Sequence, residues 1–230
     1  MSERIRINTP SGSFSAYVAR PAAPRAAVVA IQEIFGVNAV MREVCDRLAS
    51  EGYLAVCPDL FWRLEPDVDI TDQTQAEWDK AFGLMGRFDI DTGVEDIRAT
   101  IDHLRADPAS GGKVGAVGYC LGGRLAYLTA TRTDCDASVG YYGVGIETYL
   151  GEAERLANPL MLHIAGEDAY VPKEAQARIV AALKDHPQVT LHTYPGRNHA
   201  FARPGGAHFD QADATLANDR TAAFFKQHLS

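Results

Sequence analysis

Long apolar runs and basic clusters are both missing from this chain of 230 residues. No apolar stretch approaches the roughly 20 residues that a membrane-spanning helix requires, and the opening Met1–Arg4 lacks the basic and then apolar pattern of a secretion signal. The formal net charge is −8 at pH 7, and no Lys/Arg-rich segment occurs. These absences argue against a nucleic acid or an anionic membrane as a partner, and we expect a soluble, cytoplasmic and monomeric protein.

Cysteine is also scarce, with four residues at positions 45, 57, 120 and 135. None of them forms a CxxC pair, and no Cys/His cluster has the spacing of zinc ligands, so we expect no metal site. A cytoplasmic protein keeps such thiols reduced. Cys45 and Cys57 fall on a helix pattern and a strand pattern, so we interpret both as small core residues.

Linkers, internal repeats and low-complexity segments are absent as well. The hydrophobic fraction of 47% suffices for a sizeable core, and the charged fraction of 23% is ordinary for a folded chain. We therefore expect residues 1–230 to form a single α/β domain.

Short apolar runs alternate with helical patterns along the chain. The first two runs predict a hairpin, Arg4–Asn8 and Ser13–Ala19, around a Pro-Ser-Gly turn. Further strands are expected at Ala26–Ile31, Tyr53–Cys57, Val114–Gly118, Ala137–Tyr142, Leu160–Ala165 and Val189–Tyr194. Helices are expected at Asn38–Glu51, Asp72–Arg87, Asp91–Ala106, Leu121–Arg132, Lys173–Lys184 and from near Asp210 toward His228. This alternation predicts about eight mostly parallel strands with helices on both faces of the sheet.

The segment Lys113–Arg124 reads as a strand, the sequence Gly-Tyr-Cys-Leu-Gly, and a helix. This is the pattern of a nucleophile elbow with Cys120 in place of serine. Small residues at Gly118 and Gly122 allow the strand and the helix to approach closely. The helix N-terminus favours a thiolate, and the Leu121 N–H can face an oxyanion. A glycine-rich turn that contains a buried cysteine is the alternative interpretation.

Two further groups follow predicted strands in the order of an α/β-hydrolase, namely Asp168 and then His199. Because parallel strands place their carboxyl ends at one edge of a sheet, both groups are expected near Cys120. His199 would take the thiol proton, and Asp168 would hold the imidazole. Asp168 is preferred over the adjacent Glu167 as the acid. His163 lies within a strand pattern and is interpreted as a hydrogen-bonded core residue.

A fourth candidate, Glu33, follows the first parallel strand of the predicted sheet. In an α/β-hydrolase fold this loop supplies the second oxyanion N–H, for which Ile34 is the candidate. Glu33 is then either a carboxylate at the mouth of the active site or an exposed loop residue.

Several motifs resemble those of the dienelactone hydrolase family (carboxymethylenebutenolidases), and the resemblance covers nearly the whole chain. The motifs lie at Gln32–Asn38, Cys57–Leu60, Lys113–Gly123, Gly140–Gly145, Gly166–Pro172 and His199–Arg203. The resemblance implies hydrolysis of an ester bond in an unsaturated lactone that carries a carboxylate, with no metal or organic cofactor. It also implies that Glu33 holds Cys120 protonated until the substrate binds.

A substrate carboxylate requires cationic partners, and a guanidinium matches it with two hydrogen bonds. The resemblance implies two such arginines, of which Arg203 matches one. At the expected place of the other, within Asp72–Arg87, the sequence has Trp78, and Phe82 stands where the family tends to carry a tyrosine. We therefore expect a less polar pocket around Trp78 and Phe82, unless Arg87 compensates for the missing cation.

Two alternatives to a dienelactone-like activity stay open. The first is a broader carboxylesterase or thioesterase that acts on less polar substrates. The second is a non-catalytic protein whose thiol senses oxidants, although such a sensor needs no triad. Tyr141 and Tyr142 border the pocket or pack in the core, and the sequence does not separate these two interpretations.

Overall fold

The computed structural model describes residues 2–230, which divide into two compact units. Unit 1 covers the residues up to Ala116 together with Ser230, and unit 2 covers Val117–Leu229. The boundary falls inside strand β5 (Val114–Tyr119), so this strand contributes to both units. The expectation of one domain over residues 1–230 stays a prediction.

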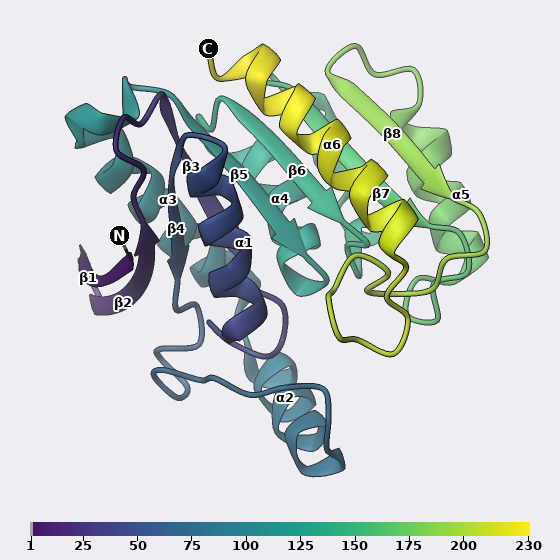
Figure 1. Cartoon of the computed structure of the whole chain (residues 1–230). Coiled ribbons are helices and arrows are strands. Elements are labelled where there is room, and N and C mark those ends of the chain that lie inside the picture. Colours follow the sequence, from purple (N-terminus) through teal and green to yellow (C-terminus); the bar gives the residue numbers. More distant parts are fainter. Residues whose placement is uncertain (1) are drawn as a thin grey trace. The chain divides into compact units, whose positions relative to one another are not determined.

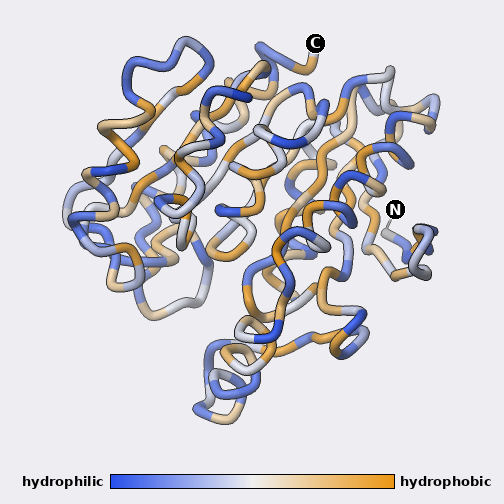
Figure 2. Tube along the Cα trace, turned by 180° about the vertical axis from the view of Figure 1, so that it is seen from behind, coloured by the Kyte–Doolittle hydropathy of each residue, from blue (hydrophilic) through white to orange (hydrophobic). Residues whose placement is uncertain are grey.

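Unit 1 contains strands β1–β4 and helices α1–α3. The strands are β1 (Ser2–Thr9), β2 (Gly12–Ala19), β3 (Ala26–Ile31) and β4 (Tyr53–Pro58), and the helices are α1 (Ala39–Ser50), α2 (Gln75–Arg87), α3 (Ile90–Ala106) and the short 3-10 helix η1 (Pro108–Ser110). The strand order is β1-β2-β4-β3. The first two strands form the predicted hairpin, whereas β3 and β4 run parallel. Every residue of β3 and β4 is buried, and apolar residues follow these strands in Figure 2.

Unit 2 contains the rest of β5 and three further strands in the order β5-β6-β7-β8. The strands are β6 (Ala137–Tyr141), β7 (Leu160–Ala165) and β8 (Val189–Tyr194); the helices are α4 (Leu121–Arg132), α5 (Lys173–Leu183) and α6 (Gln211–His228), with 3-10 helices η2 (Ile146–Thr148) and η3 (Leu150–Arg155). Strand β7 pairs in parallel with both β6 and β8. Helix α6 crosses β6 and β7 in Figure 1.

Neighbouring residues of β6 show that helices cover both faces of the sheet in unit 2. A Cβ on Gly140 would lie 2.8 Å from the Gly123 carbonyl oxygen of α4. The next side chain, Tyr141, reaches the opposite face, where its hydroxyl lies 2.7 Å from Thr221 Oγ1 of α6. Because successive side chains of a strand point to opposite faces, α4 and α6 pack on different sides of β6.

Side-chain caps fix most helix starts close to the predicted positions. Asn38 accepts the Met41 N–H at the start of α1, and Asp210 accepts the Asp213 N–H at the start of α6. Helix α2 begins at Gln75, later than the predicted start, because Thr74 is its cap. Within residues 2–230, no helix combines the length and apolar character that a membrane crossing requires.

The described residues thus contain eight strands, mostly parallel, that alternate with helices. This arrangement confirms the predicted fold class. The candidate site residues predicted from the sequence follow the carboxyl ends of four strands. These strands are β3 in unit 1 and β5, β7 and β8 in unit 2.

Candidate active site

The turn between β5 and α4 leaves no room for side chains on its glycines. A Cβ on Gly118 would lie 1.9 Å from the Gly122 carbonyl oxygen, and one on Gly123 would lie 2.4 Å from the Tyr141 carbonyl oxygen. Cys120, between them, has φ of 58° and ψ of −115°, a left-handed conformation that costs energy for a residue with a Cβ. The predicted elbow is therefore confirmed as a backbone feature.

The backbone of Cys120 is tied on both sides. Its N–H donates to the Tyr141 carbonyl at 3.1 Å, and its carbonyl accepts the N–H groups of Gly123 and Val144 at 3.0 and 3.4 Å. Leu121 is the first residue of α4, and the first N–H groups of a helix have no intrahelical acceptor. The elbow thus presents a thiol beside an N–H that can serve an oxyanion.

Asp168 and His199 meet at the same edge of unit 2. The imidazole Nδ1 lies 2.9 Å from Asp168 Oδ2 and 3.1 Å from Oδ1, and the Tyr170 N–H donates to Oδ1 at 2.9 Å. Cys120, Asp168 and His199 are 8%, 7% and 5% exposed. The imidazole also lies near the Cys120 sulfur, since the two groups interact electrostatically. The structure therefore brings the three predicted residues together as a triad.

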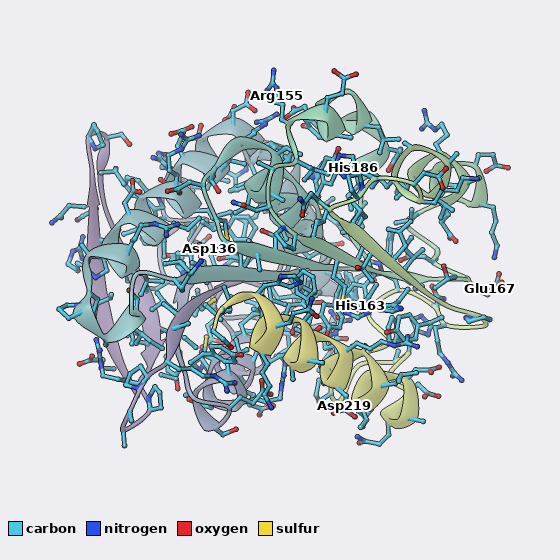
Figure 3. All side chains as sticks on the ribbon, turned by 90° about the horizontal axis from the view of Figure 1, so that it is seen from above. Asp136, Arg155, His163, Glu167, His186 and Asp219 are labelled. Atoms are coloured by element: carbon cyan, nitrogen blue, oxygen red, sulfur yellow. The ribbon has the colours of Figure 1, made fainter. Side chains whose placement is uncertain are left out.

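Glu167, the neighbouring carboxylate, does not take part in this arrangement. It is exposed, pairs with Lys173 at 2.7 Å, and points away from the sheet in Figure 3. The preference for Asp168 therefore agrees with the geometry.

The charge of the triad alters the pKa of His199. Burial alone would lower this pKa, but the nearby Cys120 sulfur, as a thiolate, and the hydrogen bonds to Asp168 and Cys120 outweigh burial and raise it to about 10. When Cys120 is ionised, an imidazolium is therefore stabilised beside it, which is the pair expected of an activated cysteine.

Asn198 is a residue of the site that the sequence did not reveal. Its Oδ1 accepts the N–H of its neighbour His199 at 2.7 Å and the N–H of Ala169 at 2.9 Å. One amide oxygen therefore fixes the loop of the acid against the loop of the base. The only local signal is that asparagine often accepts hydrogen bonds from nearby backbone N–H groups.

Two tyrosines flank the imidazole. The ring of Tyr142 lies 5.1 Å from that of His199 and the ring of Tyr170 lies 4.9 Å from it, both edge to face. Tyr142 is buried, whereas Tyr170 is 45% exposed. Tyr141, by contrast, bonds to α6 and belongs to the core. The two interpretations that the sequence left open therefore each apply to one tyrosine.

Backbone strain gathers at this site. Among residues 2–230, the non-glycine residues with positive φ are Asp67, Cys120, Tyr142 and Ala200, and the last three either belong to the triad or adjoin His199 in space or in sequence. Such conformations persist where the surroundings fix them, and they concentrate at functional sites.

Arg203, the predicted carboxylate-binding residue, lies on the turn that follows His199. Its N–H donates to the Ala200 carbonyl at 3.0 Å, and its carbonyl accepts the Gly206 N–H at 3.2 Å. The residue is buried. A cation is thus held within a few residues of the base by a structured turn.

Glu33 and Ile34 lie in unit 1, directly after β3, and both are buried, with Glu33 2% exposed. The interpretation of Glu33 as an exposed loop residue is therefore wrong. The side chain of Gln32 shapes this loop, because it donates to the Glu33 carbonyl at 3.3 Å and accepts the Leu60 N–H at 3.0 Å.

Trp78 and Phe82 form an aromatic cluster of unit 1 with Phe35, two residues beyond Glu33. The Trp78 ring meets Phe35 edge to face at 5.0 Å and stacks on Phe82 at 5.5 Å. Arg87 does not join this cluster: it is exposed at the last turn of α2, nine residues past Trp78 and about 13 Å farther along the helix axis. The cluster has the apolar character that the sequence predicted.

The fold is that of an α/β-hydrolase, and Cys120, Asp168 and His199 lie together in unit 2. Comparison with known proteins shows a match to the dienelactone hydrolase family over residues 14–229, and the chain belongs to this family. It is 55% identical to a putative carboxymethylenebutenolidase of Azospirillum brasilense, covering 95% of each chain, and 41% identical to a carboxymethylenebutenolidase of Pseudomonas putida, covering 97% of this chain and 96% of the relative.

Solved structures agree with this assignment. A putative dienelactone hydrolase from Klebsiella pneumoniae matches 99% of this chain with a TM-score of 0.86 and 25% identity, over 98% of its own length. A dienelactone hydrolase-like promiscuous phosphotriesterase from metagenomic libraries matches 99% of this chain and 98% of its own, with a TM-score of 0.82 and 21% identity. At that identity the second likeness concerns the fold alone.

Proposed function

We propose that this protein hydrolyses the ester bond of a small, unsaturated lactone that carries a carboxylate, with Cys120 as the nucleophile. The observation that carries the proposal is the triad of unit 2, in which His199 bonds to Asp168 and interacts electrostatically with the Cys120 sulfur. Relatives named carboxymethylenebutenolidase support the substrate class.

In the first half of the reaction, the Cys120 sulfur attacks the lactone carbonyl. The oxyanion that forms accepts hydrogen bonds from the Leu121 N–H and the Ile34 N–H. The ring C–O bond then breaks, a C–S bond remains, and the enolate oxygen that leaves stays attached to the acyl group. His199, as the imidazolium, can supply a proton to this leaving oxygen.

In the second half, water attacks the thioester. His199, now neutral, takes a proton from that water, and Asp168 stabilises the imidazolium that forms. Collapse of the second tetrahedral intermediate breaks the C–S bond, releases the carboxylic acid and restores the thiolate. Apart from the substrate and water, every group in this reaction is a residue of the chain.

Three further roles complete the proposal. Glu33 keeps Cys120 protonated in the free enzyme, accepts the thiol proton when the substrate binds, and returns it to the thiolate when the product leaves. Arg203 pairs with the substrate carboxylate, since a guanidinium matches it with two hydrogen bonds. Trp78 and Phe82 form an apolar wall of the pocket.

The test is the steady-state hydrolysis of a carboxylated dienelactone and of a simple aryl acetate by the wild type and by Cys120→Ala. We expect hydrolysis of the lactone by the wild type and none by the variant. Equal lactone hydrolysis by both proteins would contradict the assignment of Cys120.

The aromatic cluster of unit 1 favours a second candidate function, a broader esterase for less polar substrates. Trp78→Arg tests it, because a cation at this position should raise kcat/KM for the carboxylated lactone severalfold over that for an uncharged ester, an effect of about 1 kcal/mol. Trp78→Phe is the control that keeps the apolar wall. A wild type that prefers the uncharged ester, with a gain for the lactone in Trp78→Arg, would favour the broader esterase, whereas no gain would count against it.

We also infer a cytoplasmic, monomeric enzyme of one domain. The four free cysteines support a reducing compartment. Light scattering of the purified chain tests the monomer, and two separate thermal unfolding transitions would contradict the single domain.

A further inference from the structure

Arg124 is a partly buried cation of unit 2 that the proposed mechanism does not use. Its Nε is buried and has no hydrogen-bond partner among the described residues. Burial lowers the pKa of this guanidinium, and the nearby Tyr149, Cys120 and Glu147 oppose that shift. A cation taken partly out of water without a matching bond costs free energy, unless the charge stabilises something else.

Arg124 lies close to the proposed nucleophile, Cys120. It lies in the first turn of α4, four residues after the N-cap Cys120, and it interacts electrostatically with that residue. The Arg124 N–H donates to the Cys120 carbonyl at 3.3 Å. The cation is therefore held one helical turn from the sulfur.

The loop after β6 covers Arg124, and its glycines make this possible. A Cβ on Gly145, where φ is 90°, would lie 2.9 Å from the side-chain nitrogen Nη1 of Arg124. A Cβ on Gly143 would lie 2.8 Å from the backbone nitrogen of Arg124. The same loop carries Tyr142, whose ring meets His199. Arg124 thus lies under the loop that contacts the triad, where screening by water is reduced.

Glu147, on η2, is the carboxylate that faces this cation. Its Oε2 is buried without a hydrogen-bond partner among the described residues, and it interacts electrostatically with Arg124. The two side chains are near each other and make no ion pair within 4.0 Å among those found in residues 2–230. Glu147 therefore weakens the field of Arg124 without cancelling it.

We propose that Arg124 is an electrostatic positioning residue that stabilises negative charge at the start of α4, both on the Cys120 sulfur and on the oxyanion beside Leu121, and that Glu147 limits this effect. The role as a helper of catalysis rests on the proposed function. Its physical basis is that charges held in a poorly screened site act on one another strongly, without reorganisation during the reaction.

Other ionisable groups around the sulfur are accounted for. His199 interacts with it electrostatically, Asp168 bonds to the imidazole, and the rings of Tyr142 and Tyr170 flank the imidazole. Tyr149 faces Arg124 itself. In unit 1, Glu33 is the proposed proton acceptor. All of these groups stay unchanged in the variants that test Arg124 and Glu147.

The experiment is the pH dependence of Cys120 alkylation by iodoacetamide, measured by mass spectrometry of the peptide that contains Cys120. The full chain is used as wild type, Arg124→Gln, Arg124→Lys and Glu147→Gln. For Arg124→Gln we expect the pH of half-maximal alkylation to rise by about half a unit to one unit, and the rate at pH 7 to fall about threefold. Arg124→Lys keeps the charge and should behave like the wild type, and Glu147→Gln should lower the half-maximal pH.

An unchanged half-maximal pH in Arg124→Gln, or a shift of Glu147→Gln in the same direction as Arg124→Gln, would overturn the proposal and leave Arg124 a packing residue. Circular dichroism checks the fold of each variant. If Arg124→Gln does not fold, Arg124→Lys and Glu147→Gln decide: a raised half-maximal pH in either overturns the proposal. Because alkylation involves no ester, these outcomes stand whether or not the proposed hydrolysis is observed.

Discussion

Two histidines of the described chain are buried, and their surroundings differ in kind. His163, 1% exposed on β7, lies within 2.8 Å of the Tyr194 hydroxyl and 3.1 Å of Thr221 Oγ1, under α6 (Figure 3). His199, 5% exposed after β8, meets a carboxylate and a thiol. Burial, with His192 and Arg220 nearby, lowers the pKa of His163 well below its usual value, whereas the pKa of His199 rises to about 10.

The comparison shows that burial alone does not make a buried histidine functional. The partners of His163 are neutral hydroxyls, which do not offset the effect of burial on its pKa. His163 therefore stays neutral and is a core residue. Anionic partners overcome desolvation, so His199 can exist as an imidazolium and move protons. We therefore expect substitution of His199 to affect mainly catalysis and substitution of His163 to affect mainly stability.

The largest expected effect is the loss of catalysis in His199→Ala. This change removes the proton carrier of the triad, and kcat/KM for the preferred ester should fall about a thousandfold or more. In the same steady-state assay, His163→Gln should stay within about threefold of the wild type, since His163 touches no reacting group. A similar loss in both variants would break the comparison.

Stability should show the reverse order. His163→Leu removes the bonds from the imidazole to Tyr194 and Thr221, whose hydroxyls keep Arg220 and Tyr141 as partners, and the free energy of unfolding in urea should fall by about 1–3 kcal/mol. At pH 10, where the stabilising protonation of His199 is lost, His199→Ala should cost less. A larger loss of stability in His199→Ala would contradict the assignment of His163 to the core.

The pH dependence of stability separates the two histidines by sign. The lowered pKa of His163 means that the unfolded chain binds the extra proton, so stability falls as the pH drops below about 6.5. The raised pKa of His199 gives a contribution that is fully present below about 6.5 and is lost as the pH rises toward about 10.

Urea midpoints from pH 5 to 10 measure both limbs of this profile. His163→Leu should flatten the acid limb, and Cys120→Ala should flatten the alkaline limb, because it removes the sulfur whose negative charge raises the pKa of His199. An alkaline limb that is unchanged in Cys120→Ala would contradict the thiolate and imidazolium pair.

The smallest expected effects concern adjacent tyrosines. Tyr141→Phe removes the bonds from its hydroxyl to Asn218 and Thr221, and it should lower the free energy of unfolding by about 1 kcal/mol without changing kcat. Tyr142→Leu removes a ring that contacts His199, and it should lower kcat severalfold. Chemical denaturation and steady-state kinetics of both variants test this division, and a kcat effect in Tyr141→Phe would argue against it.

The elbow, the order of the triad and the alternation of strands and helices could be predicted, because each depends on local spacing. The glycines around Cys120 sit two and three residues away, and the caps Asn38 and Asp210 act within their own helix starts. Asn198 could not be predicted, since its role depends on a contact with Ala169, 29 residues away in sequence. The role of Arg124 depends in the same way on the covering loop at Gly145.

The tyrosines and Glu33 show a second limit of sequence patterns. Tyr141 and Tyr142 are neighbours in an apolar run, and only the end of β6 at Tyr141 and the positive φ of Tyr142 separate core from site. Glu33 is buried beside Gln32, whose side chain accepts the Leu60 N–H from another loop, and no spacing along the chain reveals that contact.

Capture of the acyl-enzyme tests the central claim most directly. Wild-type protein is mixed with a carboxylated dienelactone, quenched in acid within milliseconds and digested, and the peptide that contains Cys120 is weighed by mass spectrometry. We predict a thioester adduct with the mass of the ring-opened substrate on this peptide, and none in Cys120→Ala. Turnover of the lactone with the adduct on another residue, or undiminished turnover by Cys120→Ala, would contradict the account.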